Sequence, residues 1–267
     1  MRSFSASDAA LDGLRVIREH WRLVLGWAVF HLLAIIIMIV VSVVIAVGLA
    51  EGGAGDPRTV GAQAGGLISV LGALLTETLI AGAFYRAVMR GGPPGFFHLR
   101  IGPDELRLFV VGLVGLLIFL VLSAVTMAVG AAAGVLWGLA AAVAALGAAS
   151  LLLARFYLAG PIVIAERRIG LGRSWRMTRG STWPLVGVLW LALALVMLIS
   201  LTLWLTVGVV AGLFLGLRGF SALFTGGEGG WVFPLLQVLL QLVTVPLTMV
   251  LWLAPTVAAY RGLKAGE

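Results

Sequence analysis

The chain alternates long apolar stretches with short segments that hold most of its charge. Six of the apolar stretches reach the roughly 20 residues that a helix needs to cross a hydrocarbon core. They cover about residues 23–50, 64–89, 105–131, 134–166, 183–216 and 231–262. Because only helices and closed barrels satisfy their backbone in lipid, runs of this length predict an all-α integral membrane protein with six transmembrane helices.

The first polar segment, residues 7–22, has the spacing of an amphipathic helix, with acids and arginines on the opposite face from its apolar side chains. The apolar face consists of Leu11, Leu14, Ile17 and Trp21. Such a helix lies in the membrane interface, with its Trp at headgroup level. We therefore expect an N-terminal cytoplasmic amphipathic helix at 1–22, a six-span domain at 23–262 and a cytoplasmic tail at 263–267.

The basic residues set the orientation of these spans. Fifteen of the 18 Lys and Arg residues fall at one end of the predicted spans, and only Arg58 and Arg218 fall at the other. The positive-inside rule then places both termini in the cytoplasm. With 61% hydrophobic and 11% charged residues, and with Arg, Ala and Gly abundant, we expect a multi-pass protein of a bacterial inner membrane. The first run is too long for a signal-peptide core, although "VGLA" at 47–50 leaves cleavage as an alternative.

The spans contain a weak internal repeat. "PIVIAER" (161–167) and "PTVAAYR" (255–261) share Pro, Val, Ala and Arg at the same offsets, and "IAGAFYR" (80–86) matches the second at its Tyr-Arg end. Each segment closes an even-numbered span at the cytoplasmic face. The repeat predicts three related helical hairpins, and chance similarity among apolar segments is the alternative.

The fourth connection, "RRIGLGRSWRMTRGSTWP" (167–184), predicts a short amphipathic helix on the cytoplasmic leaflet. A helical wheel groups Leu171, Ser174, Trp175 and Thr178 opposite Arg173, Arg176 and Arg179. We expect these three arginines and Trp175 to face anionic lipid headgroups, which makes membrane lipids the expected partners. The alternative is that the charges only set topology.

The same region carries a family resemblance. Arg155, Pro161, Glu166 and "SWRMTRG" (174–180), followed by Trp183, resemble the membrane domain of one group of glycerophosphodiester phosphodiesterases and the related stand-alone YciC-like bacterial membrane proteins. The likeness in motif covers about residues 155–183, and elsewhere it is limited to the six-span layout. In the enzymes this domain precedes a soluble catalytic barrel. These residues include no counterpart of that barrel, so the resemblance implies no hydrolytic activity here.

Ionisable residues inside the spans are the strongest candidates for a special role. Counting about 1.5 Å per residue from the span ends puts His31 and Glu77 about 13 Å deep and Arg155 about 16 Å deep. An unpaired charge at the centre of a span costs about 2.5–3.5 kcal/mol on insertion scales. We therefore expect a buried Glu77–Arg155 ion pair with His31 adjacent. This layer serves either to fix helix register or as a proton or anion site.

Prolines mark three expected helix kinks, at Pro161, Pro246 and Pro255. Broken spans often line a transport site, although Pro is also common in membrane helices generally.

No residue pattern typical of catalysis is present. The chain has no Cys, its three His have no metal-ligand spacing, and neither a G-x-S-x-G elbow nor a P-loop occurs. We expect no enzyme activity, metal, cofactor or nucleic-acid partner, whereas a protein partner or homo-oligomer fits the sequence. Two functions follow. The first is a non-catalytic inner-membrane protein that supports lipid or envelope homeostasis or a partner complex, and the second is a small transporter or lipid carrier.

Overall fold

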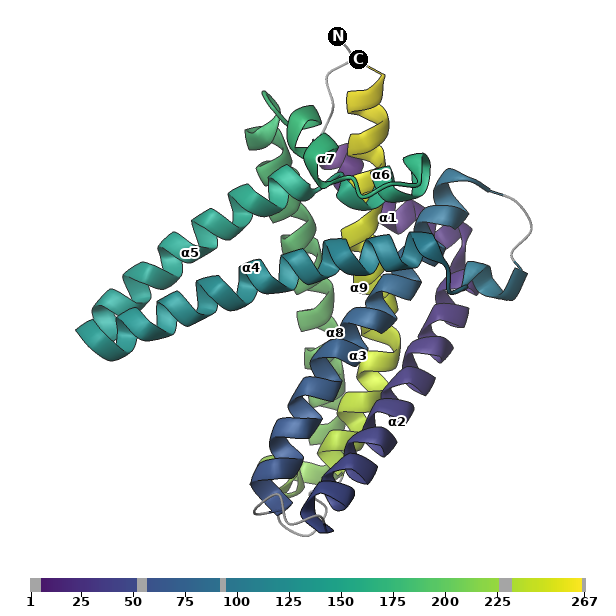
Figure 1. Cartoon of the computed structure of the whole chain (residues 1–267). Coiled ribbons are helices and arrows are strands. Elements are labelled where there is room, and N and C mark those ends of the chain that lie inside the picture. Colours follow the sequence, from purple (N-terminus) through teal and green to yellow (C-terminus); the bar gives the residue numbers. More distant parts are fainter. Residues whose placement is uncertain (1–5, 52–56, 92–94, 226–231, 266–267) are drawn as a thin grey trace. The chain divides into compact units, whose positions relative to one another are not determined.

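The computed structural model describes residues 6–51, 57–91, 95–225 and 232–265, and the described residues form helices joined by short connections (Figure 1). In chain order these are α1 (Ala6–Glu19), α2 (Trp21–Glu51), α3 (Pro57–Met89), the 3₁₀ turn η1 (Gly95–His98), α4 (Pro103–Ala133), α5 (Val135–Phe156), α6 (Ala159–Glu166), α7 (Leu171–Met177), α8 (Thr182–Thr225) and α9 (Val232–Lys264).

Six segments within the described residues are long and apolar enough to cross a membrane, which confirms the predicted number of spans. They are Trp21–Leu49, Gly65–Met89, Phe96–Ala133, Val135–Glu166, Thr182–Phe214 and Leu236–Lys264. Most of their ends lie within two residues of the predicted ones, but the third segment begins nine residues earlier, at Phe96, and the sixth begins five residues later, at Leu236.

Two helix boundaries also differ from those that the sequence predicts. The N-terminal helix α1 ends at Glu19 instead of continuing to residue 22, and Trp21 opens α2 after a bend at His20. The fifth predicted span ends at Gly216, where a positive φ of 67° interrupts helical geometry, but the helix resumes beyond it up to Thr225.

The chain divides into two compact units. One consists of residues 14–73 and 193–252, and the other of residues 1–13, 74–192 and 253–267. In the first unit, α2 and the first part of α3 approach closely along small residues. A methyl group added to Gly61 would lie 3.3 Å from Ala46 Cβ, and one added to Gly72 would overlap the thioether of Met38. The small residues therefore allow these two helices to pack at short range.

The second unit contains the α4–α5 hairpin, in which the two helices lie side by side (Figure 1). Ala133 ends α4 and Val135 begins α5, so Gly134 alone makes the turn, with a φ of 91° that glycine adopts at little energetic cost. A Cβ on Gly138 would lie 2.9 Å from the Cα of Gly130. The absence of side chains at Gly130 and Gly138 therefore allows the two helices to approach closely next to the turn.

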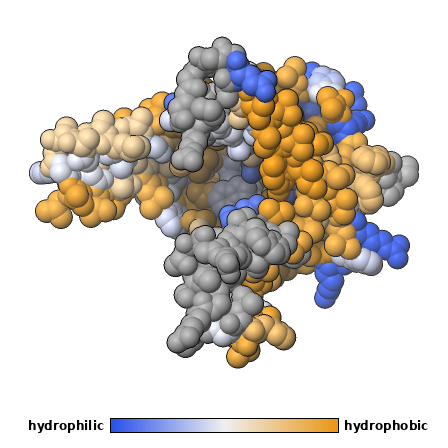
Figure 2. Space-filling view, turned by 90° about the horizontal axis from the view of Figure 1, so that it is seen from below, coloured by the Kyte–Doolittle hydropathy of each residue, from blue (hydrophilic) through white to orange (hydrophobic). Residues whose placement is uncertain are grey.

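The second unit has its own buried core, built from the last turns of α3, α6, the start of α8 and the end of α9. Its fully buried members include Ile80, Phe84, Leu158, Ile162, Val163, Ile164, Val188 and Val257. Elsewhere the helices expose much apolar surface, as Figure 2 shows in one view. Exposed Ile, Val and Leu side chains on spanning helices are what contact with hydrocarbon requires.

A candidate functional site at the arginine-rich ends of the spans

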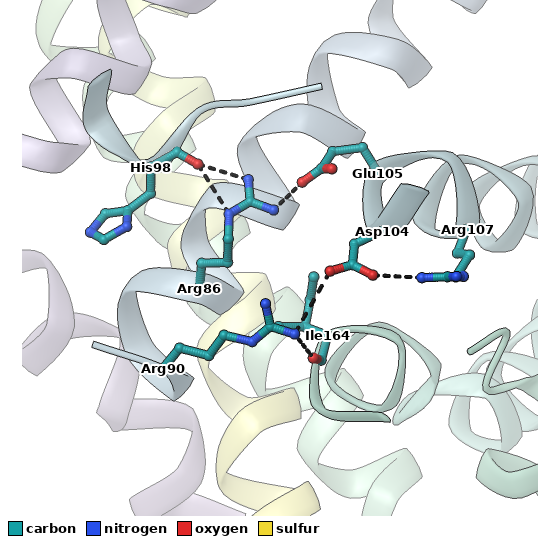
Figure 3. Close-up of polar contacts among 7 residues, drawn as sticks. All are labelled: Arg86, Arg90, His98, Asp104, Glu105, Arg107 and Ile164. Carbon is teal, nitrogen blue, oxygen red and sulfur yellow. Dashed lines mark hydrogen bonds and ion pairs between the residues drawn. The ribbon is translucent and has the colours of Figure 1, made fainter. Parts of the chain in front are cut away.

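Buried charges join the end of α3 to the start of α4. Arg86 donates from Nη1 to Glu105 Oε1, and both side chains are about 95% buried (6% and 5% exposed). Arg86 also donates from Nε and Nη2 to the carbonyl oxygen of His98, at 3.1 and 2.7 Å (Figure 3). Removing either member of such a pair leaves an uncompensated buried charge, so these contacts fix α3, η1 and α4 together.

The local sequence explains why the carboxylates lie there. Pro103 occupies the first turn of α4, and Asp104 and Glu105 follow it, where the positive end of the helix dipole favours acids. Asp104 accepts from Arg107 at 2.7 Å and lies 3.7 Å from Arg90 Nη2. Gly82 leaves the space for the pair, since a Cβ there would lie 3.1 Å from Glu105 Oε1.

The same end of α3 also contacts α6 and α9. Arg90 Nη2 donates to the carbonyl oxygen of Ile164, and Arg261 Nη2 donates to that of Val88 at 2.8 Å. The hydroxyls of Tyr85 and Thr256 are hydrogen-bonded at 3.1 Å. Three segments that share the weak repeat, around Tyr85, Ile164 and Arg261, are therefore joined by polar contacts within one unit.

A helix break lies at the centre of the segment that carries the family resemblance. α5 ends at Phe156, α6 begins at Ala159, and Pro161 in the first turn of α6 cannot donate to the carbonyl four residues earlier. Ser174 on α7 bridges the break: its hydroxyl donates to the carbonyl oxygen of Arg155 at 2.8 Å and accepts from the backbone N–H of Leu158 at 3.2 Å. Ser174 and Thr178 are fully buried, so this side of the segment packs against the protein.

Arg155 lies at this junction and stacks on Trp175. Its guanidinium carbon is 5.2 Å from the centroid of the Trp175 ring, and the Phe156 ring is 5.6 Å from the same ring. Within the part of the chain that the structure describes, Arg155 has no hydrogen bond from its side chain, and its Nη1 is buried. An aromatic face attracts a cation but accepts few of the five N–H donors of Arg.

The expected ion pair between Glu77 and Arg155 is not formed in the structure. No salt bridge joins the two among the described residues, and the Glu77 side chain is exposed instead of buried. Counting residues from the span ends fixes depth alone, whereas an ion pair also needs both side chains to point in the same direction. His31 is buried in α2, and its Nδ1 has no hydrogen-bond partner within the described ranges.

The three arginines expected to face lipid headgroups, two on α7 and Arg179 in the turn after it, have different surroundings. Arg173 lies 3.0 Å from Glu166 Oε1, and Arg168 binds the other oxygen of Glu166 at 2.6 Å. Arg176 and Arg179 are exposed, and neither has an ion pair with a described acid. The prediction that all three face lipid headgroups therefore separates into one internally paired arginine and two exposed ones.

The other predicted kinks differ from Pro161. Pro246 and Pro255 are both buried within α9, which runs as one helix through both positions. From the sequence alone, Arg86, Arg90 and Arg107 have only the role of topological charges. The signal for their network was the acidic pair after Pro103, placed among four arginines in residues 86–107. In the described ranges, no three His, Asp or Glu side chains gather with the geometry of a metal site.

The fold and these junctions define a polytopic helical membrane protein in which ion pairs and hydrogen bonds join the arginine-rich helix ends. No family model, curated protein or solved structure matches the chain.

Proposed function

We propose that this protein is a non-catalytic bacterial inner-membrane protein that supports lipid or envelope homeostasis through an anionic-lipid-binding cytoplasmic surface. The observation that carries the proposal is the sorting of charge at the arginine-rich end. Asp104, Glu105 and Glu166 are each in an ion pair with Arg, whereas Arg176 and Arg179 remain exposed. A surface with excess guanidinium groups beside a membrane attracts anionic headgroups.

The carboxylates at this end are poor candidates for acid–base chemistry. Asp104 and Glu166 each lie within 3.0 Å of an arginine nitrogen, and Glu105 is buried against Arg86. These arginine partners occupy the carboxylate oxygen atoms that a substrate would need. The engaged carboxylates therefore support a structural role for these acids.

The orientation of the chain is part of this proposal. With both termini and the arginine-rich ends in the cytoplasm, α1 and α7 lie at the inner leaflet as amphipathic helices. Leu14 and Trp21 are exposed, as an apolar face toward lipid requires. A phosphatase reporter fused at Glu267 should be inactive, while a cytoplasmic fluorescent reporter there should be active; the opposite result contradicts the topology.

Transport or lipid carriage is the second candidate, and the helix break before Pro161 is the observation that favours it. Broken spans offer free backbone groups to a substrate. Here Ser174 occupies the N–H of Leu158 and the carbonyl of Arg155, which leaves fewer groups for a ligand. This occupation makes the first function the better supported one.

Deletion of the gene, followed by lipid analysis and envelope-stress assays, tests the proposal. We expect altered anionic lipid content or greater sensitivity to detergent, restored by the wild-type chain. Normal lipids and envelope together with a substrate-specific uptake defect would contradict the first function and favour the second.

A further inference from the structure

Arg155 differs from the other arginines that anchor the span ends in this unit. Arg86, Arg90 and Arg107 each bind a carboxylate or a carbonyl oxygen. Arg155 has only the face of Trp175, and its buried Nη1 has no acceptor within the described residues. A guanidinium nitrogen taken out of water without an acceptor is destabilising, and an anion at this position would offset that loss.

The segment that packs on Arg155 supplies further positive charge. Arg179 lies in the turn after α7, next to Thr178, whose hydroxyl is 3.4 Å from the carbonyl oxygen of Arg155. Arg176 follows Trp175 on α7, and both arginines are exposed. Glu166, at the end of α6, already binds Arg168 and Arg173. Arg155 as a whole is half-buried, and its Nη1 is buried without an acceptor among the described residues, so an anion bound there would replace the missing acceptor.

We propose that Arg155, Trp175 and Arg179 form a binding site for the phosphate of an anionic phospholipid. The planar guanidinium offers parallel N–H donors that match phosphate oxygens, and Trp175 holds that plane in one orientation. Arg155 lies in the last turn of α5 and packs on Trp175 of α7, so the phosphate of a lipid whose acyl chains run along the span fits this position. The inference rests on the proposed function because it needs α7 to lie at the membrane surface.

The site makes a prediction that surface charge alone does not make. Arg155→Gln and Arg173→Gln remove the same charge, but Arg173 is paired with Glu166 and Arg155 has no such partner. Titration of phosphatidylglycerol into the full chain in zwitterionic nanodiscs, read by native mass spectrometry, compares them. We expect Arg155→Gln to weaken phosphatidylglycerol binding about tenfold or more, the usual effect of losing a charge-assisted pair. Arg173→Gln should change it by less than about twofold.

Two further arms keep the result interpretable. Arg155→Lys retains the charge and the stacking but loses the fork, so it should fold and still bind phosphatidylglycerol several-fold more weakly. Inorganic phosphate and glycerol 3-phosphate are added as competitors, and we expect neither to displace the lipid. Displacement by either one would show a site for a soluble phosphate and overturn the lipid assignment. Equal affinity of wild type, Arg155→Gln and Arg155→Lys would overturn the site itself.

The outcome separates this site from the proposed function. If Arg155→Lys loses lipid binding and yet fully restores envelope and lipid content in the deletion strain, the site stands and the proposed function fails. If it binds lipid like wild type while deletion still alters lipids, the function stands and the site is wrong.

Discussion

Two junctions in one unit hold helices together by different means. At the α3–α4 junction, a buried arginine meets a buried carboxylate, and Arg86 and Glu105 compensate each other. At the α5–α6–α7 junction, Arg155 meets an aromatic ring, and a serine hydroxyl, not a charge, bridges the helix break. At the first junction the two charges compensate each other, although Glu105 Oε2 has no hydrogen-bond partner among the described residues, whereas at the second the charge of Arg155 has no counter-charge there. A charge near a span end can therefore serve packing or binding, and its partners distinguish the two roles.

The largest expected effect on stability comes from removing one member of the Arg86–Glu105 pair. Glu105→Gln leaves Arg86 buried without a counter-charge and should destabilise the protein by about 3–5 kcal/mol. Unfolding in mixed detergent micelles measures this change. The double variant Arg86→Met/Glu105→Gln should be less destabilised than Glu105→Gln alone. A matched control, Arg107→Gln, removes a partly exposed charge and should cost about 1 kcal/mol or less. If Glu105→Gln unfolds like wild type, the pair does not hold the junction.

The hydroxyl of Ser174 bridges the helix break before Pro161 by neutral hydrogen bonds, so its loss should destabilise the protein less than loss of a buried charge. Ser174→Ala leaves the N–H of Leu158 without its acceptor and removes the donor to the Arg155 carbonyl, which should cost about 1–3 kcal/mol. Thr202→Val is the control, because the Thr202 hydroxyl is exposed and bonds only within its own helix, to Leu198. The same micelle assay should show little change for Thr202→Val. Equal effects of the two variants would contradict the bridging role of Ser174.

Close packing between α3 and α6 gives a third prediction. A methyl group on Gly160 would lie 2.5–2.8 Å from the ring and hydroxyl of buried Tyr85, so Gly160→Ala requires the ring to move. Overpacking of this kind costs about 1–3 kcal/mol, reduced by the roughly 0.5–1 kcal/mol that Ala gains over Gly in a helix. Gly187→Ala, on α8, meets nothing within 4 Å and should be neutral or stabilising. A neutral Gly160→Ala would show that α6 is free to shift away from Tyr85.

The sequence predicted the spans well because lipid imposes a simple rule on length and polarity. The turn at Gly134 also depends on residues close in the chain, since glycine adopts its positive φ at little energetic cost. The predicted Glu77–Arg155 pair is not formed in the structure. The prediction was wrong because residue counting gives the depth of a side chain and carries no information on its direction. The role of Ser174 could not be predicted because it depends on α7 folding back onto a break 16 residues earlier.

Arg86 and Glu105 form an ion pair that the sequence did not predict. They lie 19 residues apart on different helices, and only the tertiary structure places them within hydrogen-bonding distance. Each residue alone has an ordinary interpretation: Arg86 as a topological charge and Glu105 as an acid in a first helical turn. Local rules explained why each residue is present and did not show that the two form a pair.

Arg155 interacts with the ring of Trp175 and not with the carboxylate of Glu77. Double-mutant cycles on the free energy of unfolding test it directly, pairing Arg155→Gln with Trp175→Leu in one cycle and with Glu77→Gln in the other. We predict a coupling of about 0.5–2 kcal/mol between Arg155 and Trp175. The Arg155–Glu77 cycle should be additive within about 0.5 kcal/mol. Additivity in the first cycle together with a coupling of about 3 kcal/mol or more in the second would show that Arg155 pairs with Glu77 and not with Trp175.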